Sequence, residues 1–170
     1  MLAVCALAAL PVTTAAAETP SQKLFGDALI KDSKTTSAVK RLLRTGAGFV
    51  DPTVTAADLT GDGKADAVVR VRTAGAAGAV AVYLFSTHGA DSDTLRAVFR
   101  SQSLYRATTQ VRGATLVLRT PHWAQGEEFC CPAKVTQRSY TWDAARRTLV
   151  RRDIRDIPGP GAPAQAPAPG

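Results

Sequence analysis

Three aspartates in the stretch DLTGDGKADAVV, residues 58–69, have the spacing of a loop that binds a metal ion. Oxygen ligands at alternating positions around a glycine turn would come from Asp58, Thr60, Asp62, Asp66 and the backbone carbonyl of Lys64. Ca²⁺ binds about six to eight hard oxygens, which such alternating groups can direct at one centre. The pattern indicates a calcium site or, alternatively, a metal-free pair of Asx and glycine turns that begins a strand.

The end of this loop distinguishes it from an EF-hand. An EF-hand has a bidentate glutamate at its twelfth position, where this chain has Val69, part of a predicted strand. A loop that leads into a strand resembles the FG-GAP or VCBS type of repeat of extracellular β-propellers, which implies calcium ligation at the five residues above. The motif occurs once, whereas a propeller needs about four or more blades. We therefore expect a single loop and strand, with a calcium Kd of about 10⁻⁴ to 10⁻³ M.

Two adjacent cysteines, Cys130 and Cys131, are the only cysteines after residue 17. Thiols in an oxidising compartment are expected to pair, but neighbouring Cα atoms lie about 3.8 Å apart, below the usual disulfide range of about 4.4 to 6.8 Å. The alternatives are a vicinal disulfide, free or intermolecular thiols, and a metal site shared with His122. Because catalytic dithiols usually have C-x-x-C spacing, redox catalysis is disfavoured.

The cysteines belong to the longer stretch GEEFCCPAKVTQRSYTWD, residues 126–143, in which an acidic loop precedes CCP and a strand with aromatic residues. This stretch resembles the C-terminal part of small secreted actinobacterial proteins of the LppP/LprE lipoprotein type. The resemblance implies a location in the cell envelope and no known catalysis. The chain lacks the small residue that a lipoprotein signal needs, because Val4 precedes Cys5.

A hydrolase is the rival interpretation, because the chain has two histidines in predicted loops. His88 or His122 would act with loop carboxylates, for which the candidates are Asp91, Asp93, Glu127 and Glu128. The chain contains no G-x-S-x-G, P-loop, H-E-x-x-H or dinucleotide-binding pattern. Solvated loops explain the same residues, so the sequence favours a protein that is not an enzyme.

The beginning of the chain, residues 1–17, has the pattern of a secretory signal. An apolar run from Leu2 to Val12 precedes small residues, and Ala15 and Ala17 predict cleavage before Glu18. The run is shorter than the about 20 residues that span a bilayer. We therefore expect a secreted or envelope protein without a transmembrane segment in its mature chain.

The formal net charge of +7 suits anionic partners such as teichoic-type polymers or lipid head groups, but solubility is the favoured explanation. The arginines are spread over several segments, and aromatic residues make up only 6% of the chain. Because nucleic-acid binding would need aromatic residues among the basic ones for stacking, we expect no nucleic-acid partner.

The elements that must position these residues are two short helices followed by strands. The helices are predicted at residues 21–32 and 35–46, the second with Thr36 or Ser37 as N-cap and Gly46 as C-cap. Alternating or continuous apolar patterns predict seven strands, at residues 67–73, 79–86 and 95–100, two within 105–120 that turn near Arg112 and Gly113, and 134–142 and 147–153.

Short connections favour neighbouring strands in a meander. We therefore predict an α+β fold in which the N-terminal helices pack on a meandering antiparallel sheet of six or seven strands, with a wetter, arginine-bearing face opposite. The single domain is expected at residues 18–157, and the Pro/Ala/Gly-rich residues 158–170 form a disordered tail.

Together these features predict a secreted, non-enzymatic binding or structural domain of the cell envelope, with calcium as a candidate stabilising cofactor. Its partner would be an envelope or extracellular component. Tyr105 and Trp123 are candidates for the recognition surface, although packing in the core is the favoured role for either.

Overall fold

The structure is a computed structural model that describes residues 17–75, 78–87, 94–128 and 130–162. The predicted signal sequence, apart from Ala17, lies outside this part of the chain. His88, Asp91 and Asp93 of the hydrolase hypothesis also lie outside it, as do residues 163–170 of the predicted tail.

The two predicted helices are present. Helix α1, Pro20–Lys31, begins with a capping box in which Thr19 and Gln22 each accept a hydrogen bond from the other's backbone N–H. Helix α2, Ser37–Thr45, has Thr36 as its N-cap and Gly46 as its C-cap, with a φ of 69°. This left-handed conformation costs glycine little, which explains why the helix ends there.

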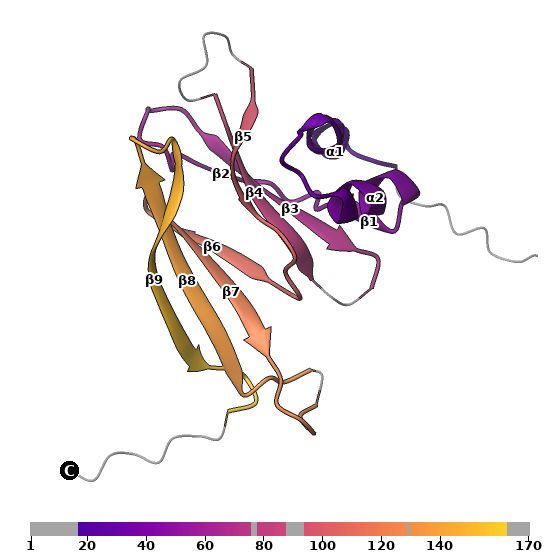
Figure 1. The fold of residues 1–170 in the computed structure, drawn as a ribbon, viewed down its shortest axis with the longest axis vertical. Helices are drawn as coiled ribbons and strands as arrows, with labels where there is room; N and C mark the ends of the chain where they lie inside the picture. Colours follow the sequence, from indigo (N-terminus) through magenta and orange to yellow (C-terminus); the bar gives the residue numbers. More distant parts are fainter. Residues whose placement is uncertain (1–16, 76–77, 88–93, 129, 163–170) are drawn as a thin grey trace, which may run out of the picture.

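Nine strands within the described residues form two antiparallel sheets (Figure 1). The first has the order β1-β3-β4-β5, with β2 also paired to β3, and its bounds are β1 Gly48–Val50, β2 Thr55–Ala57, β3 Asp66–Thr73, β4 Ala79–Ser86 and β5 Arg96–Ser101. The second has the order β6-β7-β8-β9, with β6 Thr108–Arg112, β7 Thr115–His122, β8 Lys134–Asp143 and β9 Thr148–Pro158.

All seven predicted strands are present, but they are divided between two sheets, and the short strands β1 and β2 were not predicted. The division falls between β5 and β6, where Ser103 and Arg106 have positive φ angles of 61° and 50°. Both residues turn the backbone away from an extended path. Within the described residues, an isolated antiparallel β-bridge between Ala79 and Ala107 connects the two sheets.

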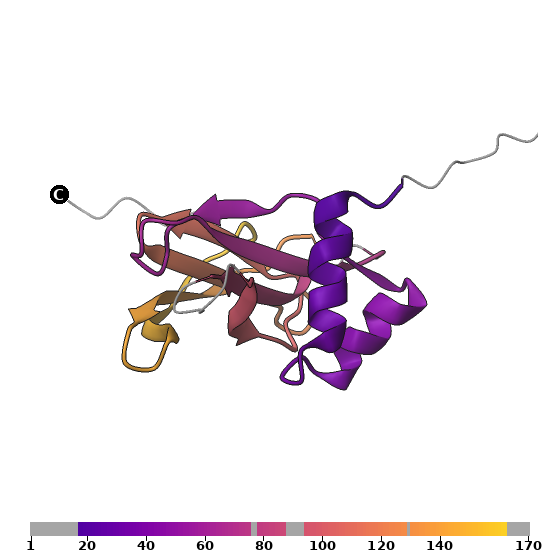
Figure 2. The same cartoon turned by 90° about the horizontal axis from the view of Figure 1, so that it is seen from above.

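The first sheet is covered on both faces, as Figures 1 and 2 show. On one face, helix residues pack against strand residues in a cluster that includes Phe25, Leu29, Val39, Val69, Tyr83 and Phe85. On the other, the two sheets share a cluster that includes Val68, Leu84, Phe99, Leu116, Leu118 and Leu149. The expectation of a wet, arginine-bearing face was therefore wrong, because the second sheet covers that face.

Candidate functional site

The aspartate loop connects β2 to β3 and is held by hydrogen bonds between its own residues. Asp58 accepts hydrogen bonds from the backbone N–H groups of Gly61, at 2.6 Å, and Gly63, at 3.0 Å. Asp62 accepts one from the N–H of Lys64 at 2.9 Å. Both glycines have positive φ angles, 76° and 80°. These contacts are those of Asx and glycine turns.

Asp66 is the buried member of this loop, with only 2% of its surface exposed. One carboxylate oxygen accepts the backbone N–H groups of Leu59, at 2.8 Å, and Thr60, at 2.9 Å. The other accepts the Thr60 hydroxyl at 3.4 Å. A buried carboxylate is stable only when such donors replace water. Asp66 therefore ties the start of the loop to the first residue of β3.

In this structure the carboxylates of the loop are not gathered around one centre as a metal site would need. The described residues contain no group of three His, Cys, Asp or Glu side chains that could hold a metal. The Thr60 hydroxyl donates its proton to Asp66, so the two groups satisfy each other. The residues predicted as ligands are neighbours in one loop, and the carboxylates of its three aspartates accept backbone N–H groups of that loop.

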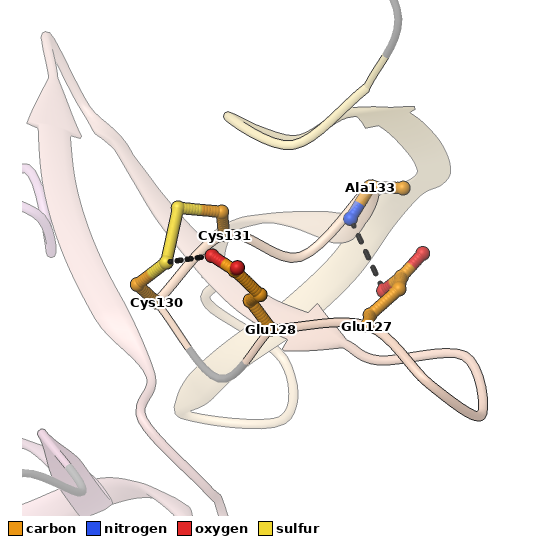
Figure 3. The surroundings of a disulfide bond; sticks show 5 residues. All are labelled: Glu127, Glu128, Cys130, Cys131 and Ala133. Carbon is orange, nitrogen blue, oxygen red and sulfur yellow. Dashed lines mark hydrogen bonds between the residues drawn. A yellow bond between two sulfur atoms is a disulfide. The ribbon is translucent and has the colours of Figure 1, made fainter.

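The cysteine pair lies in the loop between β7 and β8 (Figure 3). The sulfur atoms of Cys130 and Cys131 lie at disulfide-bonding distance, as the vicinal alternative predicts. The carboxylate of Glu128 lies 3.5 Å from the Cys130 Sγ. Glu127 accepts hydrogen bonds from the backbone N–H groups of Ala124, at 3.0 Å, and Ala133, at 3.3 Å. The acidic residues of this loop thus have structural partners.

The chain beyond β9 returns to the cysteine loop. Gly159 N donates to Ala133 O at 2.8 Å, and Gly161 N donates to Pro132 O at 3.1 Å. A Cβ atom at Gly159 would overlap the carbonyl oxygen of Pro132. The two backbones approach so closely that only glycine fits at position 159. The two hydrogen bonds hold the first residues of the predicted tail against the cysteine loop.

His122 belongs to a hydrogen-bonded row across β7, β8 and β9. The Thr136 hydroxyl lies 2.9 Å from His122 Nε2 and donates to Asp156 at 2.7 Å. Because that hydroxyl has one proton, it must accept from the imidazole. A hydrolytic nucleophile would instead give its proton to the histidine. This arrangement is therefore unlike a catalytic triad, and His122 does not line the pocket formed by α1, β5 and the turn between β8 and β9.

Asp156 also forms an ion pair with Lys134, with 2.9 Å between Asp156 Oδ2 and Lys134 Nζ. The hydrogen bond from Thr136 and that from Lys134 lower the pKa of Asp156. The carboxylate is thus kept ionised, as an acceptor of hydrogen bonds. This state suits a structural role, since a general acid needs a raised pKa.

Tyr105 and Trp123, the predicted recognition residues, are in contact. Their rings meet edge to face with centroids 5.5 Å apart, and the Arg106 guanidinium lies 5.4 Å from the Trp123 ring centroid. Tyr105 is 43% exposed, whereas Trp123 is half-buried. Trp123 therefore has a packing role as well as a partly accessible surface.

A pocket that the sequence did not predict lies where the C-terminal end of α1, strand β5 and the turn between β8 and β9 meet. Its volume is about 730 Å³. Six of the described lining residues are basic and one is acidic: Lys31, Lys34, Arg96, Arg100, Arg146, Arg147 and Asp32. Phe85, Leu95 and Trp142 add apolar surface. The pocket therefore combines a strongly basic rim with an apolar wall.

The one acidic residue of the pocket is neutralised by a basic neighbour. Arg100 donates two hydrogen bonds to Asp32, at 2.8 and 2.9 Å, and the Thr35 hydroxyl donates a third at 2.9 Å. Burial by itself would raise the pKa of Asp32, but these hydrogen bonds and that from Lys34 N outweigh it, so the pKa is lowered. Among the described lining residues, the exposed Lys31, Lys34 and Arg146 add positive charge that Asp32 does not offset.

Gln102 holds the segment between the helices against the first sheet. Its side-chain oxygen accepts from Thr36 N, at 2.8 Å, and from the Tyr83 hydroxyl, at 2.9 Å. Its side-chain nitrogen donates to Lys34 O at 3.2 Å. Burial raises the pKa of Tyr83 to about 12. These bonds position Lys34 at the rim of the pocket.

Comparison with known proteins gives one match. Residues 52–85 match the FG-GAP repeat, and they include β2, the aspartate loop, β3 and β4. FG-GAP repeats are generally extracellular, non-enzymatic binding or structural motifs, and some bind calcium. No characterised protein and no solved structure shows significant similarity to this chain. The resemblance to the LppP/LprE type therefore stays a prediction.

The described residues thus form an α+β fold with two antiparallel sheets, and residues 52–85 are similar to an FG-GAP repeat. Neither described helix is long and apolar enough to cross a membrane.

Proposed function

We propose that this chain is a secreted, non-enzymatic binding domain of the cell envelope that holds an anionic ligand in the basic pocket. The observation that carries the proposal is the excess of basic side chains around one concave surface. The FG-GAP match supports an extracellular setting, and the predicted signal agrees with it.

The charges of the pocket select the ligand class. Lys31, Lys34 and Arg146 are exposed at the rim, and Asp32, the acidic lining residue, is already paired with Arg100. A concave surface lined by one sign of charge concentrates the opposite charge. Trp142 offers an aromatic face beside this rim. A phosphate-bearing polymer of the teichoic type satisfies these features, because its phosphates repeat along a flexible chain.

The FG-GAP-like segment has a structural role in this proposal. Asp58 and Asp66 order the loop through backbone N–H groups, and the strand that follows, β3, pairs with β1, β2 and β4. The loop therefore stabilises the strand on which the first sheet is built. Calcium stabilisation would require the carboxylates of the loop to gather around one centre, which they do not do in this structure.

The proposal is tested by reversing the rim charges. We expect the triple variant Lys31→Glu, Lys34→Glu and Arg146→Glu to bind poly(glycerol phosphate) at least about tenfold more weakly than the wild type, by isothermal titration calorimetry at low salt. Arg96 and Arg147 are left unchanged because they make further interactions.

The matched control reverses three exposed arginines that do not line the pocket, namely Arg41, Arg44 and Arg112. Both triple variants change the net charge equally, so a general attraction to polyanions would weaken in both. Equal binding by the pocket variant and the wild type would refute the site. Equally tight binding of single-stranded DNA would refute the ligand class.

A further inference from the structure

Strand β9 forms an outer edge of the second sheet. It is the last strand in the order β6-β7-β8-β9, and among the residues that the structure describes Figure 1 shows no strand on its other side. Its first residue is covered, because the Thr148 hydroxyl donates to Val98 O at 2.6 Å. Residues 151–156 are all exposed, including half of the surface of Ile154. A row of backbone polar groups at such an edge is a template for another strand.

The hydrogen bonds of β9 determine which backbone groups this edge presents. Gly159 N donates to Ala133 O, in register with the pairs of Ile157 with Val135 and Ile154 with Arg138. Backbone groups of successive residues in an antiparallel strand alternate between the two sides. The N–H and C=O groups of Ile154 and Asp156 therefore point away from β8, toward the open edge.

The side chains along this edge are complementary to themselves when the strand is reversed. The sequence from residue 152 to residue 156 is Arg-Asp-Ile-Arg-Asp. In an antiparallel pairing centred on Ile154, Asp153 lies opposite Arg155 of the other copy, and Ile154 lies opposite Ile154. Opposite charges in directly facing positions stabilise a strand pair, and like charges oppose it.

We propose that two copies of this chain associate through β9, antiparallel about a two-fold axis at Ile154, so that their four-stranded sheets become continuous. Each arginine at position 155 then meets an aspartate at position 153 of the partner. The central Ile154 residues exchange backbone hydrogen bonds and cover each other's exposed side chains. Such an interface is isologous and closes at two copies.

Forming the dimer breaks only a weak ion pair within each chain. Arg155 Nε lies 3.7 Å from Asp153 Oδ2 within one chain, and both side chains are more than half exposed. An exposed ion pair of this kind contributes about 0 to 1 kcal/mol. Pro158 limits the pairing at one end, because proline has no N–H to donate. The interface is short, so the dimer is a weak one that forms at high protein concentration.

The experiment is sedimentation velocity from about 10 µM to about 1 mM, a range suited to a small interface. We expect the weight-average mass of the wild type to rise toward that of a dimer. The single variants Asp153→Arg and Arg155→Asp each place like charges opposite each other, so each is expected to stay monomeric. The double variant, with both substitutions, restores opposite charges and is expected to dimerise.

Mixing the two single variants supplies an internal control. Arg at position 153 of one chain then meets Asp at position 155 of the other, and the remaining pair is the native one, so a heterodimer is expected. Circular dichroism checks that each variant is folded. A wild type that stays monomeric at every concentration, or single variants that dimerise as the wild type does, would overturn the proposal. This test does not depend on the basic pocket.

Discussion

Asp66 is the residue on which the aspartate loop depends. Its carboxylate is buried and accepts two backbone N–H groups and a hydroxyl, whereas Asp62 is exposed and accepts one backbone N–H. Aspartates of the same motif therefore have different roles. The alternating aspartates that indicate a cation loop are also the acceptors that a metal-free turn needs.

Replacing Asp66 with alanine is expected to lower the free energy of unfolding by about 3 kcal/mol, because it leaves buried N–H donors without an acceptor. Asp62→Ala, the matched control in the same loop, is expected to cost about 1 kcal/mol or less. Urea denaturation measures both values.

The same measurements, made in chelator and in millimolar calcium, separate the two interpretations of the loop. A site with a Kd of about 10⁻³ M would stabilise the wild type by about 1.4 kcal/mol when the calcium concentration is about ten times that Kd. We expect no such gain, because the described carboxylates are not gathered around one centre. A calcium-dependent gain that Asp66→Ala abolishes would establish a metal site instead.

At the scale of elements, one ion pair joins α1 to β5. Asp32 is the C-cap of α1, and Arg100 lies 68 residues further along the chain, in β5. Their side chains are less than one fifth exposed. The pair therefore holds one wall of the basic pocket in place and also removes the negative charge within it.

The lowered pKa of Asp32 predicts a pH dependence of stability. A carboxyl whose pKa is lower in the folded state stabilises the fold above its unfolded pKa, and this gain is lost as the pH falls through the folded pKa. Near pH 7 we expect Asp32→Asn to lower the free energy of unfolding by about 2 kcal/mol. The difference from wild type should shrink once the pH falls below the ordinary value of 3.8.

Urea denaturation between pH 7 and pH 2.5 checks this prediction. Asp27→Asn is a suitable control, because Asp27 lies on the same helix and its pair with Lys23 is exposed. A difference between Asp32→Asn and the wild type that stays constant over this pH range would contradict the assigned role of the ionised carboxylate.

At the scale of the whole molecule, the two sheets bury a common core. Leu84 on β4 is fully buried in the cluster that also contains Leu116 and Leu118 of β7. Had this face of the first sheet been wet, Leu84 would contribute little to stability. The arrangement of the sheets can therefore be tested with one side chain.

Leu84→Ala is expected to lower the free energy of unfolding by about 3 kcal/mol, because it removes buried methyl groups and leaves a cavity. Leu24→Ala is the matched control, since Leu24 is 56% exposed, and it is expected to cost less than about 0.5 kcal/mol. Equal costs for the two substitutions would show that the sheets do not pack as described.

The sequence by itself determined the local features of this protein. Thr36 and Gly46 mark the ends of α2, and the alternation that includes Val69 and Val71 predicts β3. The glycines of the aspartate loop also determine its turns. Caps, turns and strand periodicity depend on residues that are close in the chain, which is why they are readable there.

Only the tertiary structure decided which surfaces meet. Leu84 and Leu116 show the same apolar character whether they lie in one sheet or in two, so the division of the strands was not predictable. The basic pocket combines Lys31, Arg100 and Arg146, which are far apart in sequence. Local patterns specify which face of an element is apolar, but the packing of those faces decides where distant charges converge.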